Sequence, residues 1–297
     1  MAEQGFLGPV ELAQTLVGVG EKKACLAINK MFLLAILAGV YIGFGAHLAT
    51  TVGTGDLPLG VKKLLMGVAF SVGLMLVVIP GAELFTGNNL MTVALCHGRI
   101  TLGGLFRNWG VVFVGNLIGS ILLAGIIAAG SGLLNGPVGA TAINIARDKT
   151  AAAPVAHLDH NVAFFLRGIG CNMLVCLAVM MAVASKDITG KVLGIFFPIM
   201  AFVASGFEHC VANMYFIPAG IFAKSFPVAV AASHLSPEQL AGLNWGSMWT
   251  CNLVSVTAGN VVGGAVFVGV VYFFAHVREQ RSAPNKQTEL REAKAPN

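Results

Sequence analysis

Two short stretches of the chain, residues 81–89 and 206–214, repeat one pattern in which Gly, Glu and Asn stand at the same places. The glutamates are Glu83 and Glu208, and neither has another Asp, Glu, Lys or Arg within 15 positions on either side. An ionisable group at membrane depth is costly, so it usually lines a pathway or is held in a hydrogen-bond network. Two such elements in corresponding places are typical of a membrane protein built from two halves, in which interrupted helices mark the transport site.

His209 directly follows Glu208 and is the strongest candidate for proton chemistry. Histidine titrates near neutral pH, so small changes in its surroundings switch its charge or let it pass a proton. A buried neutral histidine held by hydrogen bonds is the alternative. The predicted helix break around His209, and the matching break in the other half of the chain, favour the functional interpretation.

Other polar residues near the breaks fit more than one role. Glu83 and Glu208 could carry protons, or they could be structural and accept hydrogen bonds from backbone N–H groups that a helix break leaves free. Thr86 and Asn213 are short polar side chains that could satisfy such groups or face a permeating molecule. Asn172 lies between apolar residues in a predicted span, where its amide could face a pore or join two helices.

Two predicted loop segments contain residues that could bind a ligand. Lys149 and Arg147 lie beside the predicted outer mouth, where cations raise the local concentration of small anions, although plain solvated loop charges look the same in sequence. His157, Asp159 and His160 could bind a metal by residue type, but they lack the spacing of a zinc site. We therefore predict no metal site, and we predict no cofactor because no cofactor motif is present.

Composition places the chain in a lipid bilayer. Of its 297 residues, 56% are hydrophobic and only 10% are charged, whereas soluble domains carry roughly 25% charged residues. The net charge of +5 comes from loops and tails, so it sets membrane orientation and does not indicate nucleic-acid binding. A membrane enzyme that uses Glu208 and His209 is disfavoured, because there is no sizeable soluble domain or cofactor motif.

The apolar runs predict an all-α integral membrane protein with six spans, since one spanning helix needs roughly 20 apolar residues. The second and fifth spans are each interrupted, near residues 80–87 and 205–213. The predicted spans are 31–51, 61–98, 109–130, 163–185, 191–226 and a sixth within 239–277.

The chain therefore divides into a membrane domain and two polar ends. Residues 1–30 form an amphipathic cytoplasmic segment, 31–277 the channel domain, and 278–297 a polar cytoplasmic tail. The channel domain holds two repeats, about 31–132 and 163–276, joined by a Gly/Ala/Asn-rich connector. With three spans in each, the repeats must insert in opposite orientations.

Basic residues predict the orientation. With the N-terminus inside, the cytoplasmic segments hold 12 Lys and Arg residues and the outer segments hold 6. Cytoplasmic loops carry the excess of positive charge, so both termini are expected in the cytoplasm. The third and sixth spans also share a Gly-Asn-x-x-Gly motif, at 115–119 and 259–263, whose small residues allow close helix packing.

These motifs together resemble the formate/nitrite transporter family, and most of all its formate channels. The resemblance covers about residues 20–277. It rests on Leu84-Phe85-Thr86-Gly87, the whole 206–214 string, the paired Gly-Asn motifs, and Arg99-Ile100-Thr101 with Asn108-Trp109. It implies an aquaporin-like fold of six spans with an inverted repeat, a homopentamer with a pore in each protomer and lipid around it, and residence in a bacterial cytoplasmic membrane.

The resemblance also implies a site. Residues matching His209, Thr86 and Asn172 lie in the middle of the pore, and Lys149 matches a basic residue of the outer vestibule. Residues of apolar constrictions on either side match Phe70, Leu74, Leu84, Phe85, Val175 and Phe202. The expected activity is passive, proton-linked movement of a small monovalent anion, with no enzymatic reaction.

Formate is the expected anion. Nitrite or hydrosulfide is the alternative within the family, because Gly87-Asn88-Asn89 resembles other branches more than the enteric formate channels. A pore for water or another neutral solute is a further alternative. Bare anions cross apolar constrictions poorly, so an apolar vestibule should favour the neutral acid.

Overall fold

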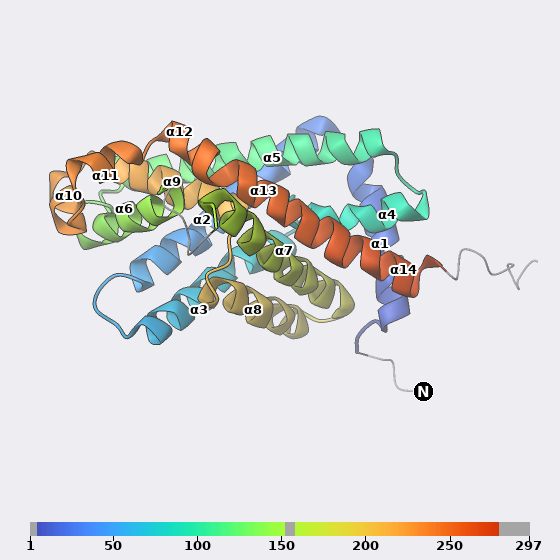
Figure 1. Ribbon diagram of the computed structural model, residues 1–297. Coiled ribbons are helices and arrows are strands. Elements are labelled where there is room, and N and C mark those ends of the chain that lie inside the picture. Colours follow the sequence, from blue (N-terminus) through green and yellow to red (C-terminus); the bar gives the residue numbers. More distant parts are fainter. Residues whose placement is uncertain (1–4, 152–157, 279–297) are drawn as a thin grey trace, which may run out of the picture.

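The structure, a computed structural model, describes residues 5–151 and 158–278, and every named element within these ranges is a helix. This outcome follows from the apolar sequence, because a backbone in lipid must satisfy its polar groups internally, as a helix does. In Figure 1 the long helices lie at oblique angles to one another, with α3 and α7 sloping in opposite senses and α5 between these two directions.

The first half of the chain forms one peripheral helix and a set of long and short apolar helices. The predicted first and second spans begin a few residues earlier than expected, at Ile28 and Leu59. The elements are α1 (Pro9–Ala24), α2 (Ile28–Val52), α3 (Leu59–Val78), η1 (Gly87–Leu90), α4 (Met91–His97), α5 (Leu102–Gly125) and η2 (Ile126–Gly130).

The second half contains a similar set, and its last helix is continuous from Trp245 to His276 but changes type along its length. Its η3 and η4 segments are π-helical. The elements are α6 (Pro137–Thr150), α7 (His160–Ala184), α8 (Ile188–Ala204), α9 (Cys210–Ala223), α10 (Pro227–Ser233), α11 (Pro237–Gly242), α12 (Trp245–Met248), η3 (Trp249–Leu253), α13 (Val254–Val261), η4 (Val262–Val270) and α14 (Val271–His276).

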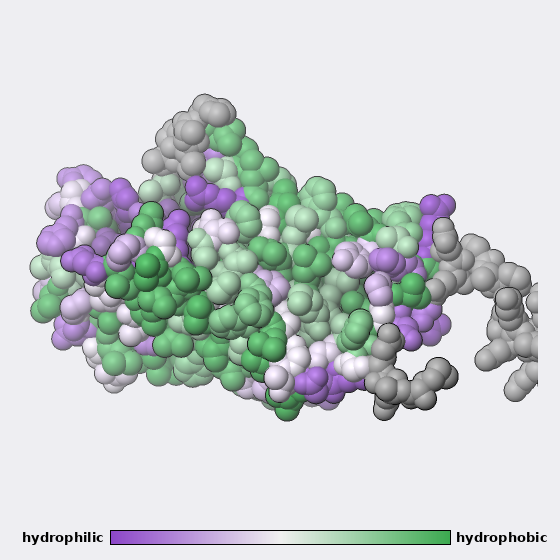
Figure 2. Space-filling view, turned by 90° about the horizontal axis from the view of Figure 1, so that it is seen from below, coloured by the Kyte–Doolittle hydropathy of each residue, from purple (hydrophilic) through white to green (hydrophobic). Residues whose placement is uncertain are grey.

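Five of the described helices are long and apolar enough to cross a membrane, and a sixth span results if the bent pair α9–α10 counts as one. In Figure 2 hydrophobic residues cover the middle of the visible face, whereas hydrophilic residues gather towards its two ends. This distribution fits a body immersed in lipid with both ends in water.

Glycines at helix contacts confirm the close packing that the Gly-Asn motifs predict. A Cβ on Gly119 would meet the Ile36 carbonyl oxygen of α2, and one on Gly259 would meet the Phe165 carbonyl oxygen of α7, in both cases far inside contact distance. The pairs α2–α5 and α7–α13 therefore approach backbone to backbone, as small residues permit.

The segment predicted as a connector contains a buried helix. After Gly136, Pro137 occupies the first turn of α6, and Ala140, Ile143 and Ala146 face the core with at most 5% exposure. Glycine, alanine and asparagine suggested a loop, but packing of one apolar face supplies most of the stability of a short helix. Helix α6 packs against α9 and α10.

The two described ends of the chain lie at the same end of the bundle. Helices α1 and α14 contact each other, and Figure 1 shows the chain entering α1 and leaving α14 on that side. Helices α10 and α11 lie at the opposite end. The predicted cytoplasmic tail, except for its first residue, lies outside the described residues.

Candidate functional site

The first site element follows the end of α3. Gly81 adopts a φ of +90°, which favours glycine, and the chain then passes Glu83 before η1 begins at Gly87. Lys23 Nζ donates to Glu83 Oε1 at 2.6 Å, and Asn88 Nδ2 donates to Glu83 Oε2 at 2.7 Å. Asn88 Nδ2 also donates to Asn108 Oδ1, and Asn108 Nδ2 donates back to the Lys23 carbonyl. We call these four residues, Lys23, Glu83, Asn88 and Asn108, the first clamp.

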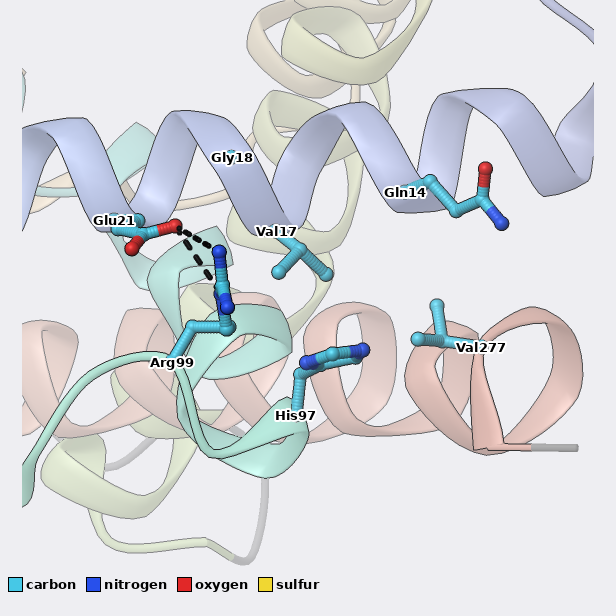
Figure 3. A pocket seen from close by; sticks show the side chains of 7 residues that line it. All are labelled: Gln14, Val17, Gly18, Glu21, His97, Arg99 and Val277. Carbon is cyan, nitrogen blue, oxygen red and sulfur yellow. Dashed lines mark hydrogen bonds and ion pairs between the residues drawn. The ribbon is translucent and has the colours of Figure 1, made fainter. Parts of the chain in front are cut away.

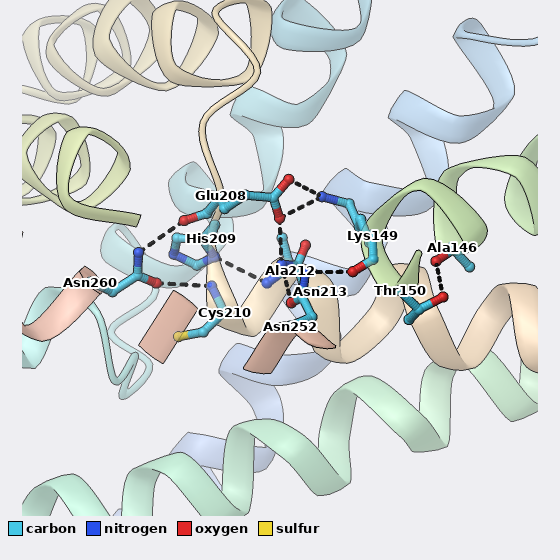
Figure 4. A network of polar contacts seen from close by, with 10 residues as sticks. All are labelled: Ala146, Lys149, Thr150, Glu208, His209, Cys210, Ala212, Asn213, Asn252 and Asn260. Atoms are coloured by element: carbon cyan, nitrogen blue, oxygen red, sulfur yellow. Dashed lines mark hydrogen bonds and ion pairs between the residues drawn. The ribbon is translucent and has the colours of Figure 1, made fainter. Parts of the chain in front are cut away.

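The second site element follows the end of α8 and has the same connections (Figure 4). Lys149 Nζ donates to both Glu208 oxygens, at 3.0 and 2.9 Å, and Asn213 Nδ2 donates to Glu208 Oε2 at 2.7 Å. Asn213 Nδ2 also donates to Asn252 Oδ1, and Asn252 Nδ2 donates to the Lys149 carbonyl. We call Lys149, Glu208, Asn213 and Asn252 the second clamp.

Two further asparagines satisfy the backbone at these places. Asn116 Oδ1 accepts the Phe85 N–H, and its Nδ2 donates to the carbonyls of Ala35 and Glu83. Asn260 does the same in the other half, accepting the Cys210 N–H and donating to the carbonyls of Gly168 and Glu208. Asn116 and Asn260 are completely buried. Buried backbone groups need such partners, so each asparagine replaces bonds that a continuous helix would have made.

These contacts refine what the sequence predicted of Glu83 and Glu208. Both carboxylates are buried and hydrogen-bonded, but they accept from lysine and asparagine side chains. Sequence reasoning missed Lys23, Asn108, Asn116, Asn252 and Asn260 as site residues. The repeated Gly-Asn motifs contain a signal for Asn116 and Asn260, but small-residue spacing alone predicts only helix packing.

His209 and Thr86 join the two halves. Thr86 Oγ1 and His209 Nε2 lie 2.9 Å apart, and both residues are at least 97% buried. His209 is also the N-cap of α9, because its Nδ1 accepts the Ala212 N–H at 3.0 Å. A backbone N–H can only donate, so Nδ1 carries no proton and the neutral ring donates from Nε2 to Thr86. The Thr86 hydroxyl hydrogen is then available to another acceptor.

Asn172 lies beside this pair and bridges the halves through its amide nitrogen. Its Nδ2 donates to Asn260 O at 2.7 Å, Asn89 Oδ1 at 2.8 Å and Thr86 O at 3.3 Å. Its Oδ1 is buried without a hydrogen-bond partner among the described residues. The amide hydrogens of Asn172 are used in these bonds, so this residue holds Thr86 in place. Only its Oδ1 is available to accept a further hydrogen bond.

Two cavities approach the Thr86–His209 pair. His209 lines one of them and Gly87, the residue after Thr86, lines the other, whereas Thr86 itself lines neither. One, of about 190 Å³, lies beside the first clamp and is lined by Lys23, Glu83, Leu84 and Leu74 among others. The other, of about 120 Å³, lies beside the second clamp. Its lining includes Lys149, Glu208, Asn213, His209, Phe70 and Phe202.

The six residues predicted at constrictions are all buried, with 1–4% exposure. Phe202 stacks on the His209 ring with centroids 5.8 Å apart, and Phe70 meets Phe202 edge to face at 5.6 Å. Leu74 and Leu84 line the first-clamp cavity. Val175 lines neither cavity, and Phe85 packs against the rings of Trp109 and Phe113.

Lys149 is not a free cation at a mouth. Both Glu208 oxygens bind its ammonium group, 15% of its side chain is exposed, and it lies 5.4 Å from the centre of the Phe216 ring. The charge of the pair is therefore balanced inside the cavity. Arg147 forms an exposed ion pair with its neighbour Asp148.

A third cavity, of about 580 Å³, lies apart from this chemistry between α1, α4 and the end of α14. Figure 3 shows that the Glu21–Arg99 ion pair spans it, while Gln14, His97 and Val277 lie around it. Neither side chain of the ion pair is buried. This cavity belongs to the attachment of α1 and brings no residue near His209.

The described residues contain no group of three or more metal-binding side chains. His157, one residue of the segment weighed as a metal site, lies outside the described residues. His160 is buried against Phe164 at the start of α7.

Known proteins match this chain over nearly its whole length. The family model described as formate/nitrite transporter matches residues 10–274. A probable formate transporter of Methanothermobacter thermautotrophicus is 42% identical over 288 residues, covering 92% of this chain and 98% of that protein. Formate channel FocA of Escherichia coli strain K12 is 38% identical over 278 residues, covering 92% of this chain and 96% of FocA.

Solved structures agree with the sequence matches. A pentameric formate channel with formate bound superposes with a TM-score of 0.76 at 43% identity, covering 84% of this chain and 98% of that chain. A further structure, an ion channel of the FNT family, gives a TM-score of 0.75 at 32% identity, covering 89% of this chain and 98% of that chain.

Proposed function

Because the chain belongs to the formate/nitrite transporter family, a family of transporters and channels, we propose that it conducts formate across a membrane. The observation that carries this proposal is the buried Thr86–His209 hydrogen bond, since His209 lines the second-clamp cavity and Gly87, next to Thr86, lines the first-clamp cavity. This pair would supply polar groups to a permeating acid that has left water.

The proposed pathway runs from one clamp cavity to the other through each protomer. Formate would leave water where Phe70 and Phe202, or Leu74 and Leu84, narrow the path. Stripping water from a bare carboxylate is expensive, so the neutral acid would cross these apolar positions. Thr86, oriented by His209, would donate its hydroxyl hydrogen to the permeant, and Asn172 would fix the Thr86 backbone.

His209 is the proposed proton site, and its geometry sets a condition on that role. Its charged form needs a hydrogen on Nδ1, which would face the Ala212 N–H. Protonation must therefore open the cap of α9 for a moment, and closing the cap would expel the proton again. Such an arrangement lets His209 exchange a proton with the permeant without keeping it.

The proposed architecture has six spans, with α3–α4 and α8–α9 as interrupted helices and the two halves inverted. Each interruption contains a glycine with positive φ, Gly81 at +90° or Gly206 at +77°, and each clamp is completed by an asparagine of the corresponding long helix. The aquaporin-like arrangement and the homopentamer rest on the similarity to the solved pentameric channel. The exposed apolar helix faces would contact lipid or neighbouring protomers.

We propose a prokaryotic cytoplasmic membrane as the location, with both termini in the cytoplasm. The excess of basic residues supports this orientation, as does the common end at which α1 and α14 lie. The relatives named above are bacterial and archaeal. In this orientation the first-clamp cavity opens inwards and the second-clamp cavity opens outwards. Residues 1–30 and 278–297 would form cytoplasmic ends around the 31–277 channel domain.

Anion flux into proteoliposomes tests the proposal. Formate, nitrite, hydrosulfide, lactate and chloride would be compared at acidic and neutral pH, together with water permeability. We expect formate to pass fastest, with flux rising on acidification and chloride excluded. Faster nitrite or hydrosulfide flux would assign another substrate within the family, and water flux without anion flux would support the neutral-solute pore. A folded protein that passes none of these would contradict the proposal.

A further inference from the structure

The second-clamp cavity lacks a free positive charge, although it is the mouth that an outside anion would meet. Lys149 and Glu208 neutralise each other within it, and the other lining residues are uncharged or aromatic, apart from the neutral His209. A cavity without net charge has no means of attracting a carboxylate from solution. The attracting group must therefore lie at its rim.

Lys63 occupies that rim. Its Nζ lies 3.9 Å from the position that a Cβ on Gly206 would take, and Gly206 is one of the residues that line the cavity. Lys63 lies in α3 and is exposed, and its side chain has neither an ion pair nor a hydrogen bond among the described residues. It is therefore a solvated cation available to a ligand.

The helix that carries Lys63 aims it along the pathway. Met66 and Phe70, three and seven residues further along α3, line the second-clamp cavity, and Leu74 lines the first-clamp cavity. At about 100° per residue, Lys63 lies within about 20° of the Phe70 direction around the helix axis, whereas Lys62 lies about 80° away. Lys63, Met66, Phe70 and Leu74 therefore lie along the side of α3 that faces the proposed pathway, and Lys63 is the first of them.

We propose that Lys63 captures the permeant anion at the rim of the second-clamp cavity before it enters. The ligand is a small monovalent anion such as a carboxylate, bound by charge and released inwards as it meets the apolar constriction. This inference rests on the proposed function. It assigns the outer capture step to Lys63 in place of Lys149, the residue that the sequence resemblance suggested.

A capture residue changes the apparent affinity and leaves the maximal rate nearly unchanged. Cations beside a low-dielectric cleft raise the local concentration of an anion and its entry rate, and salt weakens the effect within a screening length of about 8 Å at physiological ionic strength. We expect Lys63→Gln to raise the KM for external formate about two- to fivefold at low salt, and Lys63→Glu about tenfold.

The experiment measures initial formate uptake against concentration in intact cells, at low and high concentrations of an impermeant salt. Lys63→Gln and Lys63→Glu are compared with Lys63→Arg, which keeps the charge, and with Lys62→Gln, which removes the same charge one residue away. The proposal is supported if Lys63→Gln and Lys63→Glu raise the KM at low salt but not at high salt, with an unchanged maximal rate. Lys63→Arg and Lys62→Gln should give near-normal values of both.

Several outcomes would overturn the assignment. An unchanged KM in Lys63→Gln, or an equal rise in Lys62→Gln, would mean that position 63 has no special role. A fall in maximal rate with constant KM would mean that Lys63 supports the fold or a later step. Failure of the unaltered protein to take up formate would instead reject the proposed function, so the two failures are distinguishable.

Discussion

The two clamps use the same four residue types in the same order of contacts, yet only the second places a histidine beside its glutamate. In the first clamp the residue after Glu83 is Leu84, and in the second the residue after Glu208 is His209. The matching residues hold backbone and charge in place. The residue that differs, His209, supplies a titratable group. The comparison therefore distinguishes the residues that hold the structure from the candidate for proton chemistry.

A second difference between the two halves, at matching positions of α2 and α7, leads to the same conclusion. Asn116 bonds the carbonyl of Ala35 and Asn260 bonds that of Gly168, so these positions correspond. Four residues further along each helix stand Gly39 and Asn172. Gly39 lets the backbone of α5 approach, whereas Asn172 reaches Thr86 and Asn89 across the interface between the halves. The candidate site is thus concentrated at positions where the two halves differ.

Removal of a clamp carboxylate should cause the largest loss of stability, and it should differ between the clamps. Glu208→Gln would leave Lys149 charged and only 15% exposed, which we expect to cost about 3–5 kcal/mol. Glu83→Gln should cost less, about 1–3 kcal/mol, because Lys23 is 24% exposed and can reach water. Thermal unfolding of the purified variants measures both, and equal losses would show that exposure of the lysine is not the deciding factor.

Replacement of the backbone-bonding asparagines tests how equivalent the halves are. Asn116→Leu and Asn260→Leu each remove three hydrogen bonds from buried groups. Hydrogen bonds between membrane helices average about 0.6 kcal/mol, so each variant should lose about 2 kcal/mol. The two melting temperatures are expected to fall by similar amounts. A much larger fall for one variant would mean that its half bears more of the stability.

Gly264 offers a smaller test of the bridge between the halves. A Cβ there would lie 2.8 Å from Cys176 Sγ, 3.0 Å from Asn89 Cβ and closer still to Asn172 Nδ2. Gly264→Ala should cost about 1–3 kcal/mol through overpacking and should slow formate flux by shifting Asn172. Gly110→Ala is the matched control, because nothing lies within 4 Å of its Cβ. Normal flux in Gly264→Ala would contradict a positioning role for Asn172.

His209→Phe should have the smallest effect on stability and the sharpest effect on transport. Loss of the α9 cap is expected to cost about 1 kcal/mol, while proton-linked formate flux falls at least tenfold by the scale of a lost general acid–base group. His47→Phe is the control, since His47 bonds Tyr215 and lines neither clamp cavity. The measurement is formate flux over a range of pH, and an unchanged pH profile in His209→Phe would remove the role we assign to it.

The sequence predicted the class of fold and the positions of the two buried glutamates and of His209 in the candidate site, because charge and polarity in apolar runs are local signals. Glu83, Glu208 and His209 could be selected from their neighbours alone. The partners Lys23, Asn108 and Asn252 could not, since they lie on other helices and their roles depend on three-dimensional contacts.

Helix α6 escaped prediction for a related reason. Its glycine, alanine and asparagine content suggests a loop, and only the burial of Ala140, Ile143 and Ala146 against neighbouring helices explains why it is a helix. The ion pair between Lys149 and Glu208 could not be predicted from the sequence either, because the packing of α6 is what brings Lys149 to Glu208. Tertiary packing therefore determines both the helical structure of α6 and the partner of Lys149, which composition and spacing do not predict.

The balanced charges of the two clamps have an electrical consequence. Each buried carboxylate is matched by its own lysine, so the proposed pathway carries no buried gating charge, and formate that crosses as its neutral acid moves none either. A membrane potential acts only on net charge, by roughly 2.3 kcal/mol per elementary charge for each 100 mV. Flow through such a pore would follow the concentration gradients of formate and protons, and it would be silent in an electrical recording.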